Sequence, residues 1–522
     1  MRFAVIVVLV SLSALGAPQK PRKPAVALMP TSSRLPELQK LGLLIDARAS
    51  ELLELAAKTN ELHLRQVLAM ADSESIDPST LSDPKIASLA RINLGADRVV
   101  TSTLEAKGSG LLLTGAVIDA TRSTPFSVEL PTTWPEAVVA GSEAIAKAVN
   151  GGAPKRASTQ PESKSQEALV ALADCYATVV RQPMAIETPA VLEPAELDAA
   201  IGSCRKSLEL DPTLRFAQAT LALAQAINGD DSGAAKSLGA LADADDVVEQ
   251  YSLARFWLLT RYQSNDAGLA FLRSIVARHP TELIARAAVA ETLASLNENA
   301  KAIDAWNEVL SVVPSSPIAL GRLSRAQARA GKRDESLVSA KKALELAPQS
   351  HEARLQLASR YIDLAKPDDA ITTLKPLTDL KSPRGEHLLR LGWAYWIKGD
   401  RERAATYFQQ ALDRATGVSE WRTRGRAFYN LALVEAKRGQ TDAAKVALKA
   451  SFQTGFRMRT LDESLVTVSR DVERSGAQAF DGGNRPSLMP RESSLFPLDL
   501  FGEIQPLATK PPPPEGLVLF RF

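Results

Sequence analysis

Few side chains in this sequence are of the types that hold metals or act as nucleophiles. Its 522 residues include four histidines and two cysteines. The histidines are His63, His279, His351 and His387. Zinc sites take several Cys, His or carboxylate ligands at short characteristic spacings, and these residues are too few and too scattered to supply them. We therefore expect neither a metal centre nor a cofactor.

Motifs that carry out catalysis are also missing from the sequence. It has no P-loop, no dinucleotide-binding glycine pattern, no H-E-x-x-H and no G-x-S-x-G. The nearest acid–base pair is His351-Glu352, which at the start of a predicted helix is typical of a surface pair. Acidic pairs such as Asp230-Asp231 fall in predicted turns, where carboxylates cap helices. The sequence therefore predicts a protein that is not an enzyme.

Charge and composition exclude a further class of function. There are 62 Lys and Arg against 60 Asp and Glu, a formal charge of +2, and 45% of the residues are apolar. Such a chain can bury cores in two or three modules. It has no basic stripe of the kind that nucleic-acid binding requires, so we expect no nucleic acid as a partner.

The start of the chain has the pattern of an export signal. Arg2 precedes the apolar run Ala4 to Leu15, which is too short to span a bilayer. We predict a signal peptide over residues 1–16 and a mature chain that begins at Ala17. The alternative is an uncleaved anchor. No later apolar run approaches the length that spans a bilayer, so the mature protein should lack a transmembrane segment and be soluble in the periplasm.

Residues 24–150 alternate patterns of strands and helices. Ala25 to Met29 is a buried-strand run, and the leucines that follow it recur at helical spacing. We interpret His63 to Ala69 as a second strand. Arg98 to Glu105 and Leu111 to Ala120 are two strands joined by a glycine-containing turn, and a helix follows from Trp134.

The order of these elements resembles the amino-terminal domain of TolB-like bacterial envelope proteins. The residues that carry the resemblance are Val26 to Pro30, Leu94 to Val100 and Ile118 to Thr121. The resemblance implies a small α/β domain and a place in the cell envelope. The propeller that follows this domain in TolB is absent here.

A repeat dominates the rest of the chain, after a small and polar linker at residues 151–164. Pro212, Pro280, Pro314 and Pro348 recur at one constant interval or at twice that interval. The interval corresponds to a period of about 34 residues, which indicates units of two antiparallel helices.

With this period, the chain resembles tetratricopeptide repeats. The residues from Gly385 to Val418 match the family pattern at Leu388, Leu391, Gly392, Tyr395, Ala404, Phe408 and Ala411. We count eight units over residues 165–458, a capping helix over 459–481 and a proline-rich tail over 482–522. The resulting fold is mainly α: a tetratricopeptide solenoid of about eight helix pairs preceded by a small α/β domain.

The resemblance also implies a groove on the inner side of the solenoid, lined by the first helix of each unit. The residues at its lining positions are Trp257, Arg261, Arg325, Arg329, Trp393, Trp396, Tyr429 and Lys437. Tryptophans and arginines are frequent in binding hot spots, and we predict an acidic or aromatic peptide as the ligand, centred on Trp393 and Trp396. The alternative is that the tryptophans pack between adjacent repeats.

Cys175 and Cys204 fall on the two helices of the first unit, on either side of a long loop. In an oxidising, exported compartment the two can form a disulfide, and the alternative is two buried thiols. Together these features predict an exported, periplasmic scaffold that binds protein partners in envelope assembly or trafficking. The alternative function is a regulatory or enzyme-associated subunit whose α/β domain binds a small ligand.

Overall fold

A computed structural model describes most of the chain between residues 22 and 474. The described ranges are 22–56, 58–152, 163–181, 194–241, 248–280, 282–416, 420–454 and 463–474. The predicted signal peptide and proline-rich tail lie outside them, as does most of the predicted linker. The predicted fold class is confirmed: a five-stranded sheet with its helices precedes a helical solenoid.

The sheet has the strand order β2-β1-β3-β4-β5. Its strands are β1 (Ala25–Leu28), β2 (Asn60–Leu62), β3 (Arg98–Lys107), β4 (Gly110–Ile118) and β5 (Ser123–Leu130). β1 is parallel to both of its neighbours, with Ala27 opposite Leu62 and Val99, whereas β3, β4 and β5 are antiparallel. Every residue of β1 is buried, because helices cover both faces of this short apolar strand.

Helices α1 (Pro36–Ala56) and α4 (Trp134–Asn150) cover one face of the sheet. Val26 and Leu28 point to these helices, while Ala25 and Ala27 point to the other face. That second face carries α2 (Leu64–Ser73) and α3 (Pro84–Leu94). The structure therefore overturns the prediction of a strand at His63 to Ala69. The buried residues of this segment continue at helical spacing to Ala71, which a strand would not allow.

Eight antiparallel helix pairs and one further helix follow the α/β domain in the described part of the chain. They are α5 (Gln166–Val179), α6 (Pro194–Leu210), α7 (Arg215–Asn228), α8 (Asp231–Gly239), α9 (Val248–Tyr262), α10 (Asn265–Arg278), α11 (Leu283–Ser295), α12 (Asn299–Val312), α13 (Pro317–Arg329), α14 (Arg333–Leu346), α15 (His351–Asp363), α16 (Pro367–Thr378), α17 (Gly385–Lys398), α18 (Arg401–Arg414), α19 (Trp421–Lys437), α20 (Thr441–Gln453) and α21 (Glu463–Arg474). Helix α21 lies within the segment predicted as a capping helix.

Capping residues mark the repeat where the first helix of a unit begins. The side chains of Glu282, Ser316 and Ser350, which recur at the interval of the prolines, accept hydrogen bonds from the first-turn amides of α11, α13 and α15. A repeated cap fixes the same starting point in each unit. The units therefore stack with a constant offset and curve into a superhelix.

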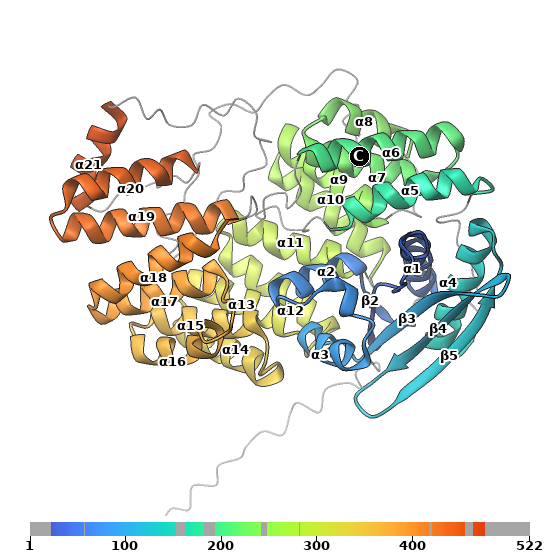
Figure 1. Ribbon diagram of the computed structural model, residues 1–522, viewed down its shortest axis with the longest axis horizontal. Helices are drawn as coiled ribbons and strands as arrows, with labels where there is room; N and C mark the ends of the chain where they lie inside the picture. The colour runs from blue at the N-terminus through green and yellow to red at the C-terminus, as the bar shows by residue number, and fades with distance from the viewer. Residues whose placement is uncertain are drawn as a thin grey trace, which may run out of the picture.

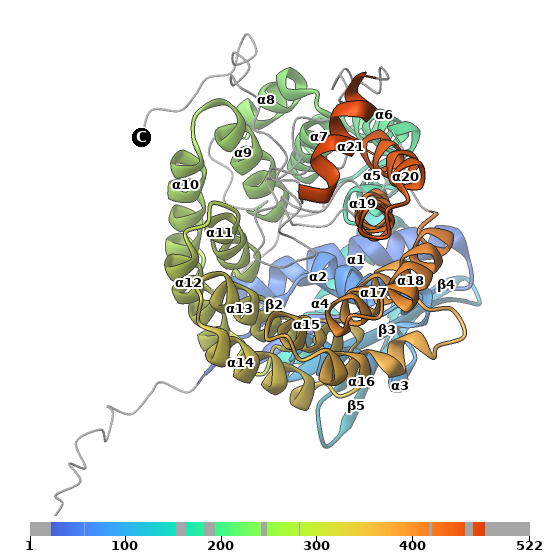
Figure 2. The same cartoon turned by 90° about the vertical axis from the view of Figure 1, so that its left-hand side faces the viewer.

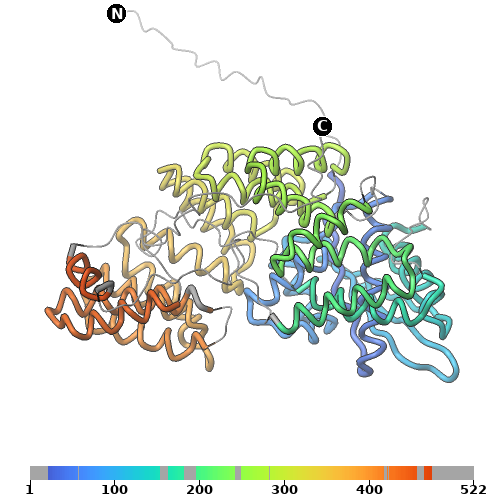
Figure 3. Tube along the Cα trace, turned by 90° about the horizontal axis from the view of Figure 1, so that it is seen from above, coloured from blue at the N-terminus to red at the C-terminus, as the bar shows by residue number. Residues whose placement is uncertain are grey.

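The solenoid curves around the α/β domain. Figure 2 shows helices α5 to α18 in an arc, with α1, α2 and β2 inside its curve, whereas β4 and β5 extend past it. The domain and the first unit share one apolar core, in which Leu41 and Leu44 of α1 belong to the same cluster as Leu172 and Tyr176 of α5. Figure 1 shows α1 next to α5. The last units, orange to red in Figure 3, extend beyond the domain. The α/β domain thus covers part of the inner side of the solenoid.

Candidate functional site

The surface where the α/β domain meets the solenoid joins distant parts of the chain. Helices α2 and α3 of the domain contact the units from α9 to α17 of the solenoid. We call this contact the seam. One part of the seam is apolar: Leu283 and Val313 of the solenoid belong to the same cluster as Ala27 and Ala96 of the domain. Here the backbone of Gly95 lies so close to the loop before α13 that an added Cβ would be 2.2 Å from the carbonyl oxygen of Ser315.

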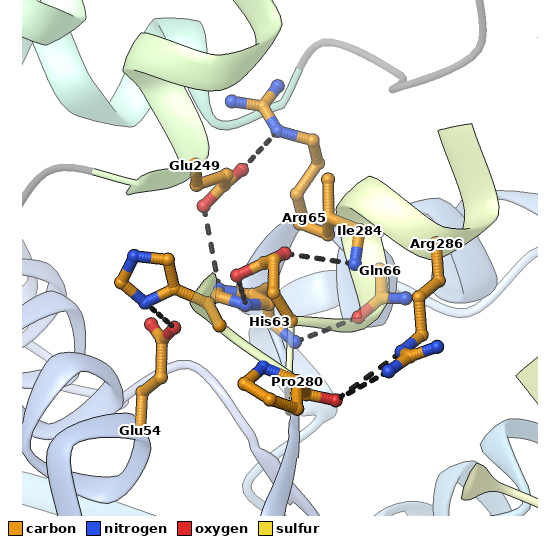
Figure 4. Close-up of polar contacts among 10 residues, drawn as sticks. Glu54, His63, Arg65, Gln66, Glu249, Pro280, Ile284 and Arg286 are labelled. Atoms are coloured by element: carbon orange, nitrogen blue, oxygen red, sulfur yellow. Dashed lines mark hydrogen bonds and ion pairs between the residues drawn. The ribbon is translucent and has the colours of Figure 1, made fainter. Parts of the chain in front are cut away.

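A cluster of charged side chains forms the second part of the seam (Figure 4). His63, which precedes α2, lies between two carboxylates of the solenoid. Its Nε2 is 3.2 Å from Oε2 of Glu282, and its Nδ1 is 3.7 Å from Oε2 of Glu249. Glu282 also caps α11 by accepting a hydrogen bond from the amide of Ile284. All three ionisable side chains are buried.

Arg65, in the first turn of α2, also belongs to this cluster. Its Nε donates to Oε1 of Glu249 at 2.6 Å, and its Nη1 donates to the carbonyl oxygen of Val179 at 2.8 Å. Next to the cluster, Nδ1 of His279 lies 3.5 Å from Oε1 of Glu54 on α1. The domain thus presents cationic groups to a pair of acidic residues on α9 and before α11.

Burial and mutual charge set the protonation of this cluster. Burial alone would lower the pKa of His63, but the negative charges of Glu282, Glu61 and Glu249 outweigh it and raise the pKa well above 6.5. The pKa of Glu282 is lowered, because the charge and hydrogen bond of His63 outweigh its burial. Burial raises the pKa of Glu61 on β2 to about 7. At neutral pH the pair His63–Glu282 is therefore ionic.

Charged contacts at the far end of α2 form the third part of the seam. The carboxylate of Glu74 accepts hydrogen bonds from Oγ of Ser350 at 2.6 Å, the amide of His351 at 2.6 Å and the amide of Glu352 at 3.3 Å. A residue of the α/β domain thus caps a helix of the solenoid. Nearby, Nη1 of Arg384 donates to the carbonyl oxygen of Asp72 at 2.6 Å.

The remaining two histidines lie beside this contact. The rings of His351 and His387 meet edge to face, with their centroids 5.6 Å apart. Burial, followed by the positive charge of Arg384, lowers the pKa of His351, and burial together with His351 lowers the pKa of His387 to about 4. Both rings are therefore neutral at pH 7. All four histidines of the chain lie in or next to the seam.

The predicted centre of the peptide groove is not an open surface. Trp393 is 2% exposed and packs with Phe408 and Ala427 in the core between units. Trp396 is half-buried, and the guanidinium of Arg401 lies 5.8 Å from the centroid of its ring. Because Trp393 is enclosed by the following unit, the prediction that it is accessible to a peptide was wrong, and the alternative of packing between repeats describes it.

The predicted arginines tie neighbouring helices of the solenoid together. Arg329 is buried and donates to the carbonyl oxygen of Ala294, one unit earlier, at 3.2 Å. Arg325 lies 3.5 Å from the carboxylate of Glu291, and Arg261 is buried in an ion pair with Asp231. Two arginines not predicted as groove residues make similar links. Nη1 of Arg360 donates to the carbonyl oxygen of Ser324 at 3.2 Å, and Nη1 of Arg390 donates to Oγ of Ser359 at 2.7 Å.

The other predicted groove residues differ in their exposure. Trp257 is half-buried against the apolar core that the domain shares with the solenoid, and Tyr429 is fully buried beneath α21 among Leu465 and Val468. Lys437, in the last turn of α19, is exposed. Accessibility to a peptide is therefore contradicted for Tyr429, as it is for Trp393, Arg261 and Arg329, because neighbouring helices cover these side chains.

Cys175 and Cys204 are joined by a disulfide between α5 and α6, with their Cα atoms 5.3 Å apart. Within the described residues, no group of three or more His, Cys, Asp or Glu side chains is arranged to hold a metal ion. No helix in the described ranges is both long enough and apolar enough to cross a membrane.

Sequence reasoning missed the residues of the seam: His63, Arg65, Glu74, Glu249 and Glu282. One signal was available for them. The segment after β2 places basic residues at the start of a helix and acidic residues at its end, which is the reverse of what a free helix favours. Such an arrangement indicates charges that have partners elsewhere in the fold.

Comparison with known proteins identifies the repeat. Residues 288–351 and 355–419 match a tetratricopeptide-repeat family model. No curated protein matches the chain. Three of the similar solved structures follow. A tetratricopeptide repeat protein from Parabacteroides merdae is 15% identical over 55% of this chain and 99% of its own, with a TM-score of 0.37. Yeast Tom70 is 14% identical over 61% and 67%, with a TM-score of 0.42. PilW, a type IV pilus biogenesis factor, is 20% identical over 42% and 98%, with a TM-score of 0.34.

At these identities and TM-scores, the likeness to the solved structures says nothing of partners or activity. The family model covers the units from α11 to α18, where the sequence matches the repeat pattern best and where a cap recurs at the start of successive units. The helix pairs over residues 288–419 therefore match the tetratricopeptide-repeat family.

Proposed function

We propose that this protein is an exported scaffold that binds other proteins of a bacterial cell envelope through the inner side of its solenoid. The observation that carries this proposal is the seam. The solenoid already holds one folded domain on its inner side, by an apolar patch, buried ion pairs and a helix cap. These are the means by which protein interfaces are formed, so this surface has the chemistry of a protein-binding site.

Two features support export. The pattern of residues 1–16 is that of a signal peptide, and a disulfide such as Cys175–Cys204 persists in oxidising compartments. The resemblance of residues 24–150 to the amino-terminal domain of TolB-like proteins supports the envelope in particular. We expect the mature protein, isolated from its native compartment, to begin at Ala17 and to carry no acyl chain. N-terminal sequencing and intact mass measure this, and a retained Met1 would contradict export by cleavage.

Site-specific photo-crosslinking of the full chain in its native cells tests the binding proposal. A photoreactive residue at Lys437, exposed on the first helix of its unit, reports on the inner side of the last units. The same residue at Val338 of α14, which is 66% exposed, reports on a second helix of a unit. We expect a discrete protein adduct from position 437 and none from position 338. Equal adducts from both positions, or none from either, would refute binding through the inner side.

A further inference from the structure

Helix α2 lies along the solenoid like a bound ligand. His63 and Arg65 at its start contact Glu249 and Glu282, on α9 and before α11. Asp72 and Glu74 at its end contact Arg384, before α17, and the first turn of α15. The distance along the helix axis from His63 to Glu74 is about 16 Å, so one short helix spans the inner side of the solenoid from the third unit to the seventh.

The charges of α2 oppose the stability of the helix that carries them. A helix favours acidic side chains at its start and basic ones at its end, and α2 has no acidic residue in its first turn and no basic residue in its last. His63 precedes its start, and Glu74 follows its end. Each reversed charge therefore destabilises the helix when it is isolated. The arrangement is explained by the solenoid, which supplies two carboxylates at one end and free amides with an arginine at the other.

The two sides of α2 differ in chemistry. Val67, Met70 and Ala71 pack in the apolar cluster that the α/β domain shares with Leu283 and Val313 of the solenoid. The hydrogen bonds and ion pairs that α2 and its flanking residues make with the solenoid come from His63, Arg65, Asp72 and Glu74. Interfaces that form and separate are more polar than permanent ones, and the polar contacts at both ends of α2 are of this kind, whereas α1 joins α5 through a continuous apolar core.

We infer that α2 occupies a helix-binding groove of the solenoid, and that the protein partner presents a short helix of the same polarity, with cationic side chains at its start and a carboxylate about 16 Å further on. The partner binds by displacing α2. This inference rests on the proposed function, because it assigns a partner to the same inner side. The groove residues are Glu249, Glu282, Ser350 and Arg384, with the free amides at the start of α15.

Occupancy by α2 lowers the affinity of the groove for any partner. A site available for only a fraction of the time binds with its intrinsic dissociation constant divided by that fraction. A tethered helix has an effective concentration in the millimolar range, so the closed form prevails until a ligand outcompetes it. Substitutions in the domain that weaken the contacts of α2 with the solenoid, and leave the groove residues unchanged, must therefore increase the affinity of the groove for an added helix.

The test uses the full chain and a peptide that copies α2. The peptide spans Glu61 to Ser75, is labelled with a fluorophore, and carries a hydrocarbon staple in place of Val67 and Ala71, which lie in the apolar cluster and make none of the polar contacts. The staple is needed because a free peptide of this length is only marginally helical. Fluorescence anisotropy measures its binding to the wild-type chain, to His63→Gln and Glu74→Gln, and to Glu129→Gln. Glu129 is the matched control, since it lies on β5 with a side chain 77% exposed.

We expect His63→Gln and Glu74→Gln to bind the peptide at least tenfold more tightly than wild type does, and Glu129→Gln to bind like wild type. A peptide with His63 and Arg65 changed to Glu and Glu74 changed to Lys should not bind. A correctly folded Glu74→Gln chain that shows no gain would overturn the inference. Circular dichroism and exchange protection of α19 and α20 establish folding.

A second measurement covers variants that fail to fold. Hydrogen exchange of the wild-type chain at saturating peptide should increase over residues 64–74, because displaced α2 loses its partners. Unchanged exchange with bound peptide would mean that the peptide binds elsewhere, and would also overturn the inference. Neither assay uses a natural partner. Peptide binding without crosslinks at position 437 would refute the proposed function alone, and crosslinks without peptide binding would refute the helix groove alone.

Discussion

The imidazole of His63 faces carboxylates from three elements: Glu61 on β2, Glu249 on α9 and Glu282 before α11. Arg65 is the other cation beside them, and it is held by Glu249. A proton on His63 is therefore bound more tightly in the folded protein than in the unfolded chain, as is a proton on Glu61, whose pKa burial raises to about 7. Both protons couple the closure of the seam to pH.

The first prediction concerns this coupling. A group whose pKa is raised by folding stabilises the folded state fully below its unfolded pKa and loses this contribution as the pH rises through its folded pKa. For His63 the loss begins above pH 6.5, and for Glu61 it is complete above about pH 7. We expect the free energy of unfolding to fall by about 1 kcal/mol or more between pH 6 and pH 9. Urea titration across this range measures it, and His63→Gln should reduce the slope.

Asp46 contributes to the same trend from within the α/β domain. Burial raises its pKa to about 7, although Thr31 donates two hydrogen bonds to it. Adding Asp46→Asn to the His63→Gln chain separates the contributions of Asp46 and His63 to the pH dependence of stability. Only the loss of His63 should change hydrogen exchange at the seam. A pH dependence of stability identical in wild type and His63→Gln would contradict the assignment of His63.

A second prediction at the residue scale concerns Gly95, which ends α3 with a φ of 70° next to the solenoid. Gly151 ends α4 with the same φ of 70°. An added Cβ at Gly151 would meet no atom within 4 Å, whereas at Gly95 it would meet the backbone of Ser315 at 2.2 Å. Gly151→Ala should therefore cost only the strain of the left-handed conformation, about 1 kcal/mol.

Gly95→Ala should cost about 2 kcal/mol more than Gly151→Ala, because the backbone on one side of the seam must also shift. Thermal or urea unfolding measures both, and hydrogen exchange should increase at the start of α13 in Gly95→Ala alone. Equal losses in the two variants would mean that the seam tolerates this displacement.

At the scale of elements, the inner helices of the solenoid pack against neighbouring helices. Trp393 of α17 packs edge to face against Phe408 of α18, with ring centroids 6.1 Å apart, and lies in one cluster with Val434 of α19. We expect Trp393→Ala to lower the free energy of unfolding by about 3–5 kcal/mol, the usual cost of a large core truncation. Val446→Ala on α20, where the side chain is 71% exposed, is the control and should change stability little. A small loss for Trp393→Ala would contradict its role in packing between units.

Helices of the solenoid could be predicted from the sequence because each unit repeats the same local pattern of residues. Prolines at Pro314 and Pro348 and caps at Ser316 and Ser350 recur with the period of the fold, so the signal is repeated. The error at His63 to Ala69 has the opposite cause. A single short apolar stretch fits a strand or a helix, and the helical spacing shows only when Met70 and Ala71 are included.

The occupied inner side could not be predicted in the same way. The family pattern identifies which positions face inward, and it contains no information about what a particular chain places there. Arg65 and Glu249 are 184 residues apart, and Glu74 and Ser350 are 276 apart. No periodicity links residues at such separations. Arg329 and Arg360 show a related limit, because an inward arginine that ties two units together has the same spacing as one that binds a ligand.

On the scale of the whole molecule, one crosslink holds the first unit, against which the α/β domain packs. The Cys175–Cys204 disulfide closes a loop with a sequence separation of 29 residues and lies in the core shared with α1. Replacing both cysteines with Ala should lower the free energy of unfolding by about 3 kcal/mol. The comparison with wild type is made by urea unfolding without reductant. Thiol titration of the denatured, unreduced wild-type chain should find no free thiol, and two free thiols would contradict the bond.

The seam also determines the order in which the molecule can assemble. Helix α2 is synthesised long before its partners: the bond between Asp72 and Arg384 spans 312 residues, whereas β3 and β4 pair across a short turn and each repeat packs on its neighbour. Contacts of such separation form late, since the intervening chain must first be ordered. A nascent chain that has reached only α14 therefore displays the charged ends of α2 without Ser350 or Arg384 to receive them. The seam can therefore close fully only after the chain has been synthesised as far as α17.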